Sequence, residues 1–295
     1  MSKRVTRPVL RWHGGKYKLA AWIIKHLPPH RIYVEPFGGA ASVLMQKAPS
    51  YAEVYNDLDD QVVTLFRILQ DPGQAEQLRD RLMLTPYSRL EFNKSYELTN
   101  DPMEVARRLV IRAYMGFGSN AHASTERGHR STGFRANANR SGTTPARDWK
   151  NYPDAIPAMV ERLRGVIIEH RDAFAVMAQH DGPATVHYVD PPYMPDTRSM
   201  RNPYDRKYRM YRHELDAEGH VKLLEFLQTL EGMVVLSGYA TPLYDDGLPG
   251  WRRVTREAYA DGARKRTEVL WINQVAVAAL PGALGTQGDL GMEPS

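Results

Sequence analysis

Two stretches of the chain alternate between the patterns of β-strands and helices, and this alternation limits the possible folds more than any other feature. The first stretch begins with the apolar segment 31–37, which leads into the small residues of segment 38–45. A strand, a glycine turn and a helix-forming segment in that order are typical of the first βα unit of a Rossmann-like domain. A second strand is expected at 52–57 and an amphipathic helix at 61–69, so this part of the chain predicts an α/β fold.

The alternation stops between residues 71 and 150. Helical patterns occupy 75–84 and 102–115, and segment 118–150 has no periodicity and is rich in Gly, Ser, Asn, Thr and Arg. That segment carries six Lys or Arg residues against two acids. We interpret 71–150 as an inserted, mainly helical domain with a basic loop.

The strand and helix patterns resume after residue 150. We expect a helix near the N-terminus at 16–27, strands at 165–169, 185–190 and 233–237, helices at 155–163, 173–180 and 214–230, and a terminal hairpin of 251–259 and 267–274. Residues 1–70 and 151–279 are therefore predicted to form one discontinuous domain. The Gly- and Pro-rich residues 280–295 are predicted to be disordered.

Ligands of an open α/β sheet bind at the carboxyl ends of its strands, and several polar segments are expected there. The first is the run from Trp12 to Lys16, in which Gly14 and Gly15 let the backbone approach a ligand and Lys16 can meet a carboxylate. A turn that only introduces the following helix is the alternative.

The second segment follows the first strand, and its residues are Glu35, Pro36, Phe37, Gly38 and Gly39. It lacks the glycine spacing of nicotinamide-dependent dehydrogenases, and Glu35 would repel their pyrophosphate. A carboxylate beside the glycines better suits a cationic ligand such as S-adenosylmethionine, although a turn without a ligand is also possible. Asp57 stands where acids bind a ribose, and Asp172 raises the possibility of an adenine contact, but either residue could instead cap a helix.

The most specific segment is Asp190, Pro191, Pro192 and Tyr193, directly after an apolar strand. The amine of a nucleobase is a poor nucleophile because its lone pair is delocalised into the ring. Asp190 and the carbonyl of Pro191 could accept hydrogen bonds from both N–H groups and turn that lone pair towards a methyl donor. Tyr193 could stack on the base. The segment thus predicts methylation of an aromatic amine.

The chain has no cysteine, which excludes disulfides, thiolate zinc ligands and the covalent route to cytosine C5 methylation. The ten histidines show no metal spacing, and no metal is expected. No apolar run approaches the roughly 18 residues of a membrane span, and no signal peptide is evident, so a cytoplasmic protein is expected. The net charge of +5 alone is weak evidence for a polyanionic partner.

These segments, in this order and spacing, resemble the Dam-like family of adenine-N6 DNA methyltransferases, which has phage-borne members. The resemblance runs from about residue 9 to residue 273, and segment 266–273 is similar to the family's closing strand. It implies a Rossmann-like S-adenosylmethionine-dependent methyltransferase fold, in which 71–150 is the target-recognition domain. His13 stands where family members commonly have Ala.

By this resemblance, Trp12, Lys16, Asp57 and Asp190 would contact S-adenosylmethionine, and residues 35–39 would line its pocket. Residues 190–193 would hold an adenine flipped out of double-stranded DNA. Two basic segments, 118–150 and 198–212, are expected to contact DNA phosphates; their candidate residues are Arg127, Arg130, Arg135, Arg140, Arg201, Lys207 and Arg209. No obligate protein partner is evident.

Other functions remain open on the sequence alone. The same turn could methylate cytosine N4, RNA adenine or a protein amide, or the chain could be a catalytically inactive DNA-binding protein. A nicotinamide dehydrogenase is disfavoured by the missing glycine spacing. The sequence does not indicate which bases surround the target, whether a restriction enzyme is paired with the protein, or whether it acts as a monomer.

Overall fold

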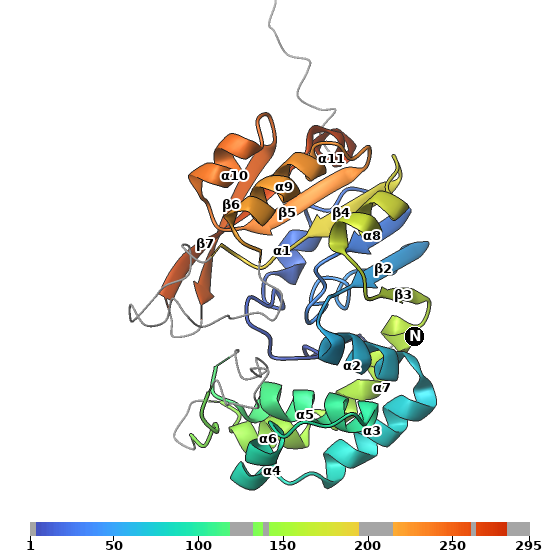
Figure 1. The fold of residues 1–295 in the computed structure, drawn as a ribbon, viewed down its shortest axis with the longest axis vertical. Helices are drawn as coiled ribbons and strands as arrows, with labels where there is room; N and C mark the ends of the chain where they lie inside the picture. The colour runs from blue at the N-terminus through green and yellow to red at the C-terminus, as the bar shows by residue number, and fades with distance from the viewer. Residues whose placement is uncertain (1–3, 119–131, 138–141, 195–214, 261–263, 282–295) are drawn as a thin grey trace, which may run out of the picture.

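The computed structural model describes residues 4–118, 132–137, 142–194, 215–260 and 264–281. Its centre is a seven-stranded sheet with the strand order β3-β2-β1-β4-β5-β7-β6 (Figure 1). The strands are β1 (Ile32–Glu35), β2 (Ala52–Asn56), β3 (Val166–Glu169), β4 (Thr185–Val189), β5 (Met233–Gly238), β6 (Arg252–Ala260) and β7 (Arg264–Ile272). The first five are parallel, and β7 pairs antiparallel with both β5 and β6. The predicted α/β fold, its strands and its terminal hairpin are confirmed.

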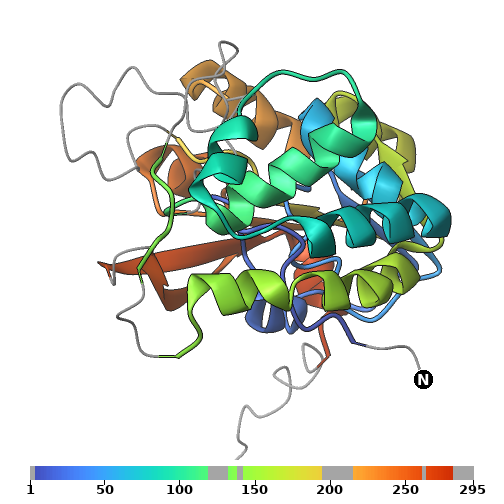
Figure 2. The ribbon, with the colours of Figure 1, turned by 90° about the horizontal axis from the view of Figure 1, so that it is seen from below.

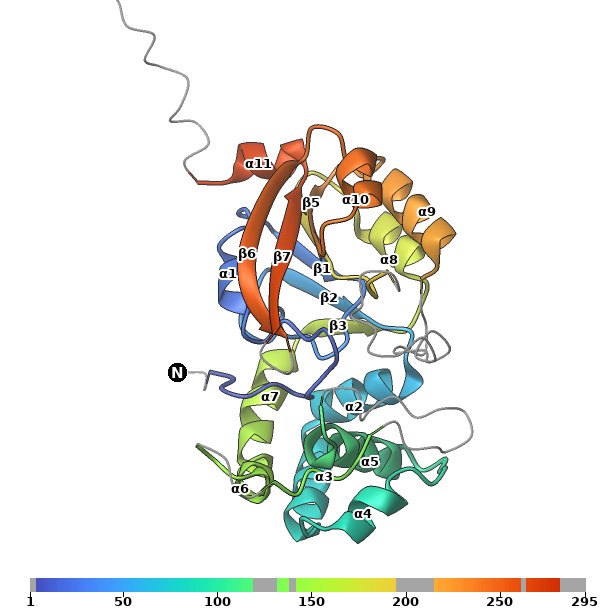
Figure 3. The same cartoon turned by 90° about the vertical axis from the view of Figure 1, so that its left-hand side faces the viewer.

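Side chains alternate between the two faces of the sheet, and each face has its own apolar core. On β5, Val234 and Leu236 pack into one cluster, whereas Met233 and Val235 face the opposite way. This alternation is what a strand buried on both faces requires. Figure 3 shows α1 on one side of the sheet and α8, α9 and α10 on the other.

The helices of the α/β part are α1 (Ala20–Ile24), α2 (Asp60–Gln70), α7 (Ile156–Leu163), α8 (Ala173–His180), α9 (Ala217–Leu227), α10 (Pro242–Gly247) and α11 (Gln274–Ala279), and a 3-10 turn at Pro153–Ala155 precedes α7. The predicted helices are confirmed at α2, α7, α8 and α9. None of the helices in the described part of the chain is long and apolar enough to cross a membrane.

Between α2 and α7 lie α3 (Pro72–Leu84), α4 (Arg89–Lys94), α5 (Pro102–Met115) and α6 (Pro145–Lys150). They form a helical group that lies below the sheet in Figure 1 and in front of it in Figure 2. Its apolar side chains belong to one cluster that also takes in α2, α7 and the strands. The predicted boundaries at residues 71 and 150 thus fall within a continuous core, and the division into domains stays a prediction.

Three details differ from the sequence prediction. The N-terminal helix is regular only over Ala20–Ile24, and segment 42–46 forms hydrogen-bonded turns rather than a regular helix. The short helices α4, α6, α10 and α11 were not predicted, because six residues are too few to show a helical period. Each nevertheless begins at a side-chain cap, for example Ser88 before α4 and Thr144 before α6.

The strand order reverses at β1, and this reversal determines where a ligand can bind. From β1 the chain crosses to β2 on one side, whereas β4, on the other side, is reached later through β3. Connections that leave two adjacent parallel strands in opposite directions open a crevice at their carboxyl ends. The segments that begin at Glu35 and Asp190 follow these two strands, so the fold brings together the two most informative motifs of the sequence.

Candidate active site

Asp190 follows the last residue of β4 and is fixed through one of its two oxygens. Its Oδ1 accepts a hydrogen bond of 2.8 Å from Ser237 Oγ on β5. The same atom lies 2.9 Å from Lys16 Nζ, which comes from the segment before α1. The N-terminal segment, β4 and β5 therefore meet at this carboxylate.

Lys16 is buried at the centre of the site, with 4% of its surface exposed. Besides Asp190, its ammonium donates to the carbonyl of Gly14 at 2.8 Å and lies 3.5 Å from Glu268 Oε1. It also sits 4.5 Å from the ring centroid of Tyr193. Lys16 thus contacts groups of the protein itself, two carboxylates among them, and its expected contact with a ligand stays a prediction.

Tyr193 is buried and its hydroxyl donates to Glu268 Oε1 on β7. Its ring meets Tyr239 edge-on, with centroids 4.5 Å apart. Burial raises the pKa of Tyr193 well above its ordinary value, and the charges of Glu268 and Asp190 act in the same direction. Tyr193 is therefore a neutral phenol, and its expected stacking on a base stays a prediction.

Glu35 ends β1 and is almost fully buried. Its Oε2 accepts hydrogen bonds from Tyr33 Oη at 2.7 Å and from the backbone N–H of Leu44 at 3.1 Å. Burial raises the pKa of Glu35 to about 8, and the charge of Asp190 contributes to this rise. The carboxyl of Glu35 is therefore mostly protonated at neutral pH.

The turn after Glu35 is held by Asp57, which follows β2. Asp57 Oδ2 accepts from the N–H of Gly39 at 2.7 Å, and its Oδ1 accepts from the N–H of Asp59 at 2.8 Å. Asp59, not Asp57, caps α2. The helix-cap alternative is thus excluded for Asp57, and its ribose contact stays a prediction.

Both glycines of this turn are needed for packing. A side chain at Gly38 would come within 2.1 Å of the Tyr55 ring, and one at Gly39 within 2.9 Å of Trp12 Nε1. Gly39 also has a φ of +48°, which other residues rarely adopt. Trp12 and the turn therefore lie against each other, as two parts of one predicted pocket should.

Asp172 lies at the same edge of the sheet but serves as a helix cap. It is exposed and its Oδ1 accepts from the N–H of Ala175, at the start of α8. Asn56, not Asp172, joins this part of the chain to the turn after Glu35. Its Nδ2 donates to the carbonyl of Pro36 in that turn and to the carbonyl of Arg171, next to Asp172. The adenine contact of Asp172 stays a prediction.

Sequence reasoning missed Glu268, Ser237 and Tyr33. Glu268 directly precedes the apolar residues 269–272 of β7, and 3% of it is exposed. An acid that adjoins the apolar half of a strand was the available signal. Ser237, at the end of an apolar strand, carried a weaker one.

The residues expected to contact DNA are mostly outside the described residues: Arg127, Arg130, Arg140, Arg201, Lys207 and Arg209. Arg135 is described and has 8% of its surface exposed. Its guanidinium lies 3.9 Å from Asp148, and its carbonyl accepts from Tyr87 Oη. Arg135 therefore contributes to packing beside α6, and its predicted DNA contact stays untested.

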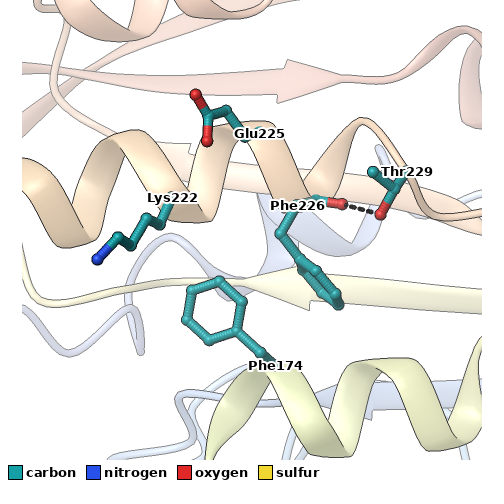
Figure 4. Close-up of a pocket in the computed structure, with 5 residues that line it drawn as sticks. All are labelled: Phe174, Lys222, Glu225, Phe226 and Thr229. Carbon is teal, nitrogen blue, oxygen red and sulfur yellow. Dashed lines mark hydrogen bonds between the residues drawn. The ribbon is translucent and has the colours of Figure 1, made fainter.

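A shallow hollow lies between α8 and α9 (Figure 4). It is lined by Phe174, Lys222, Glu225, Phe226 and Thr229, and its two phenyl rings meet edge-on with centroids 5.0 Å apart. None of these residues is one of the predicted site residues or bonds to Asp190, so the hollow is not part of the candidate site.

Residues 12–260 match the family model of the D12 class of N6 adenine-specific DNA methyltransferases. The chain is 27% identical over 198 residues to the DNA adenine methylase of Escherichia coli, an alignment that covers 64% of this chain and 66% of that protein. The corresponding values for the Vibrio cholerae DNA adenine methylase are 26% over 196 residues, with the same coverage. The chain thus spans just under two thirds of the length of these relatives. With most of its length matched, the chain belongs to the D12 class of N6 adenine-specific DNA methyltransferases.

Proposed function

We propose that the protein transfers a methyl group from S-adenosylmethionine to N6 of adenine in double-stranded DNA. The observation that carries this proposal is the corner after β4, where Asp190 and Tyr193 meet Lys16 and Glu268 beside the turn that follows Glu35. This corner lies at the reversal of strand order, where open sheets bind their ligands. The family match and the relatives named as DNA adenine methylases support the same reaction.

The residues of the corner fit a cationic methyl donor. Among the described residues, Lys16 is ion-paired with two carboxylates, those of Asp190 and Glu268, and the buried carboxyl of Glu35 lies near enough to Asp190 for its pKa to respond to that charge. Burial raises the pKa of Glu268 as it does that of Glu35, and it outweighs the lowering by Lys16 at Glu268 and by Lys47 at Glu35. S-adenosylmethionine supplies an activated methyl group on a positively charged sulfur, and Trp12 with residues 35–39 and Asp57 would hold it.

The chemistry left to the protein is to make the adenine amine nucleophilic. Asp190 and the carbonyl of Pro191 would accept the two N–H groups, so that the nitrogen lone pair turns out of the ring and towards the methyl carbon. Tyr193, which keeps its proton, would present its ring to the base without adding a charge. Transfer forms one N–C bond, breaks one S–C bond and releases one proton from the nitrogen.

The base must leave the duplex to reach this corner, at a cost of a few kcal/mol. We propose that segments 118–150 and 198–212 hold the distorted DNA by its phosphates, and that residues 71–150 read the target sequence. Replacing Arg201 and Lys207 by Gln should then weaken binding of every DNA sequence and reduce its salt dependence.

Cytosine N4, RNA adenine and a protein amide are the competing acceptors. The test incubates the protein with S-adenosylmethionine carrying a labelled methyl group and with duplex DNA, RNA or protein, and identifies the product by mass spectrometry of the digested material. The proposal expects N6-methyladenine in DNA and its loss in Asp190→Ala, with DNA binding largely kept. Label in cytosine or RNA alone, or unchanged turnover in the variant, would overturn it.

Membership of a phage-type branch and a cytoplasmic location are further proposals, and pairing with a restriction enzyme stays open. Mapping modified adenines in the DNA of an expressing host would identify the target sequence, which bears on the phage-type branch and on the pairing.

A further inference from the structure

The hydroxyl groups of Ser237 and Tyr188 form a buried chain that ends at Asp190. Ser237 has no exposed surface and Tyr188 has 1%. Ser237 Oγ lies 2.8 Å from Asp190 Oδ1 and 3.1 Å from Tyr188 Oη. The two hydroxyls come from the neighbouring strands β4 and β5, whose other inward residues near them are apolar.

The direction of these hydrogen bonds follows from the acceptor at their end. A carboxylate can only accept, so Ser237 donates its proton to Asp190. The oxygen of Ser237 is then free to accept from Tyr188, which keeps its proton because burial raises its pKa well above the ordinary value. Each hydroxyl polarises the next, which strengthens the bond that reaches the carboxylate.

The two oxygens of Asp190 are therefore in different situations. Oδ1 receives Ser237 from one side and Lys16 from another. Within the described part of the chain, no donor bonds to Oδ2. Two donors on one oxygen fix the rotation of the carboxylate about its last bond, which leaves Oδ2 as the oxygen available to a substrate.

We infer that Ser237, held by Tyr188, is a positioning residue that fixes Asp190 so that Oδ2 accepts the amino group of the base. This inference rests on the proposed function. A carboxylate already held in place costs no further ordering when the substrate arrives, and a misplacement of about 1 Å can reduce a rate by roughly 100-fold. Ser237 itself does not touch the substrate.

The test compares Ser237→Ala with a matched control, Ser95→Ala. Ser95 is also a buried serine, with 1% exposed, and its hydroxyl donates to the carbonyl of Phe92 at 2.7 Å within the helical group. Single-turnover rates of methyl transfer, dissociation constants for S-adenosylmethionine and for duplex DNA, and the melting temperature are measured for each protein.

Ser237→Ala is expected to lower the single-turnover rate by about 10- to 100-fold while both dissociation constants stay within about twofold of wild type. Ser95→Ala is expected to keep the wild-type rate. Tyr188→Phe, which removes only the second hydroxyl, should lower the rate less than Ser237→Ala does. Ser237→Thr, which keeps the donor, should recover most of the rate if it melts near the wild-type temperature.

A wild-type rate in Ser237→Ala would overturn the inference, and so would a loss that Ser95→Ala shares. A loss confined to DNA or donor affinity would also overturn it, because a positioning residue acts on the rate of the bound complex. If Ser237→Thr does not fold, the single-turnover rate of Tyr188→Phe is the test instead, and a rate equal to that of wild type would contradict the role given to Tyr188. A wild-type protein that methylates no DNA adenine would instead refute the proposed function, and the inference with it.

Discussion

Two buried ionic clusters lie at opposite edges of the same sheet, and they differ in charge. At the amino edge, Glu53 near the start of β2 binds two cations. Arg162 donates to both of its oxygens, at 2.6 and 2.9 Å, and Lys47 donates to one of them. At the carboxyl edge the proportion is reversed, because among the described residues Lys16 is ion-paired with two carboxylates, those of Asp190 and Glu268, and Glu35 is a further buried carboxyl whose pKa the charge of Asp190 raises.

The pKa shifts follow this difference. Burial tends to raise the pKa of Glu53, but the hydrogen bonds and charges of Arg162 and Lys47 outweigh it, and the pKa falls below its usual value. Burial raises the pKa of both Glu35 and Glu268, and the charge of Asp190 raises both further, so that the cations that act on them, Lys47 at Glu35 and Lys16 at Glu268, do not compensate. At the amino edge the carboxylate of Glu53 is stabilised by the protein's own cations, whereas at the carboxyl edge a positive charge brought by a ligand would stabilise the ionised forms of Glu35 and Glu268.

The largest expected effect comes from Asp190→Asn, which keeps the shape of the side chain and removes its charge. The amide can no longer accept through both oxygens, so we expect the single-turnover rate of methyl transfer to fall by at least ~10³-fold. The melting temperature should stay close to that of wild type or rise, because one of the crowded carboxylates is gone. A variant that keeps its rate would remove Asp190 from the chemistry.

Glu53→Gln makes the corresponding change at the amino edge and should have the opposite effects: it should lower stability and leave the rate of methyl transfer almost unchanged. It leaves Lys47 and Arg162 buried without their carboxylate, which costs about 3 kcal/mol of stability. Denaturant unfolding measures this loss, and methyl transfer per folded molecule should stay within about twofold of wild type. A large loss of rate without a loss of stability would show that the two clusters do not have separate roles.

A smaller effect concerns pH and Glu35. Its folded-state pKa of about 8 is above the usual value of 4.5, so the folded protein keeps a proton that the unfolded chain loses as pH rises between these values. Stability should therefore fall with rising pH in this window, by about 2 kcal/mol between pH 5 and pH 7. Glu35→Gln should flatten this dependence in denaturant titrations of the ligand-free protein. An equally steep dependence in the variant would assign it to other groups.

Much of the fold could be predicted from the sequence, because it rests on local patterns. The apolar strands that lead into Glu35 and Asp190, and helices with a clear period such as α2 and α7, were found where they were expected. The short helices were not, since each depends on one cap and on tertiary packing. Segment 38–45 was expected to be helix-forming, but it forms turns instead, and the N–H of Leu44 bonds to the side chain of Glu35 rather than to the backbone of a helix.

The site could be predicted only in part, for a similar reason. Asp190 and Tyr193 are adjacent in the sequence and carry their own signal. Their partners come from distant strands: Glu268 lies 75 residues beyond Tyr193, and Ser237 lies 47 residues beyond Asp190. No local pattern shows that such residues meet, and the pairing of Lys16 with Asp190 was likewise visible only after the N-terminal segment had been placed against the sheet.

The most direct test of the charge difference is the number of protons released when S-adenosylmethionine binds. Calorimetric titrations at pH 7 in buffers with different ionisation enthalpies give this number. A cation bound beside Glu35 should drive its carboxyl to ionise, so wild type and Glu53→Gln should release close to one proton per donor bound, and Glu35→Gln close to none. Donor binding that releases no proton in wild type, or as many in Glu35→Gln, would contradict the account.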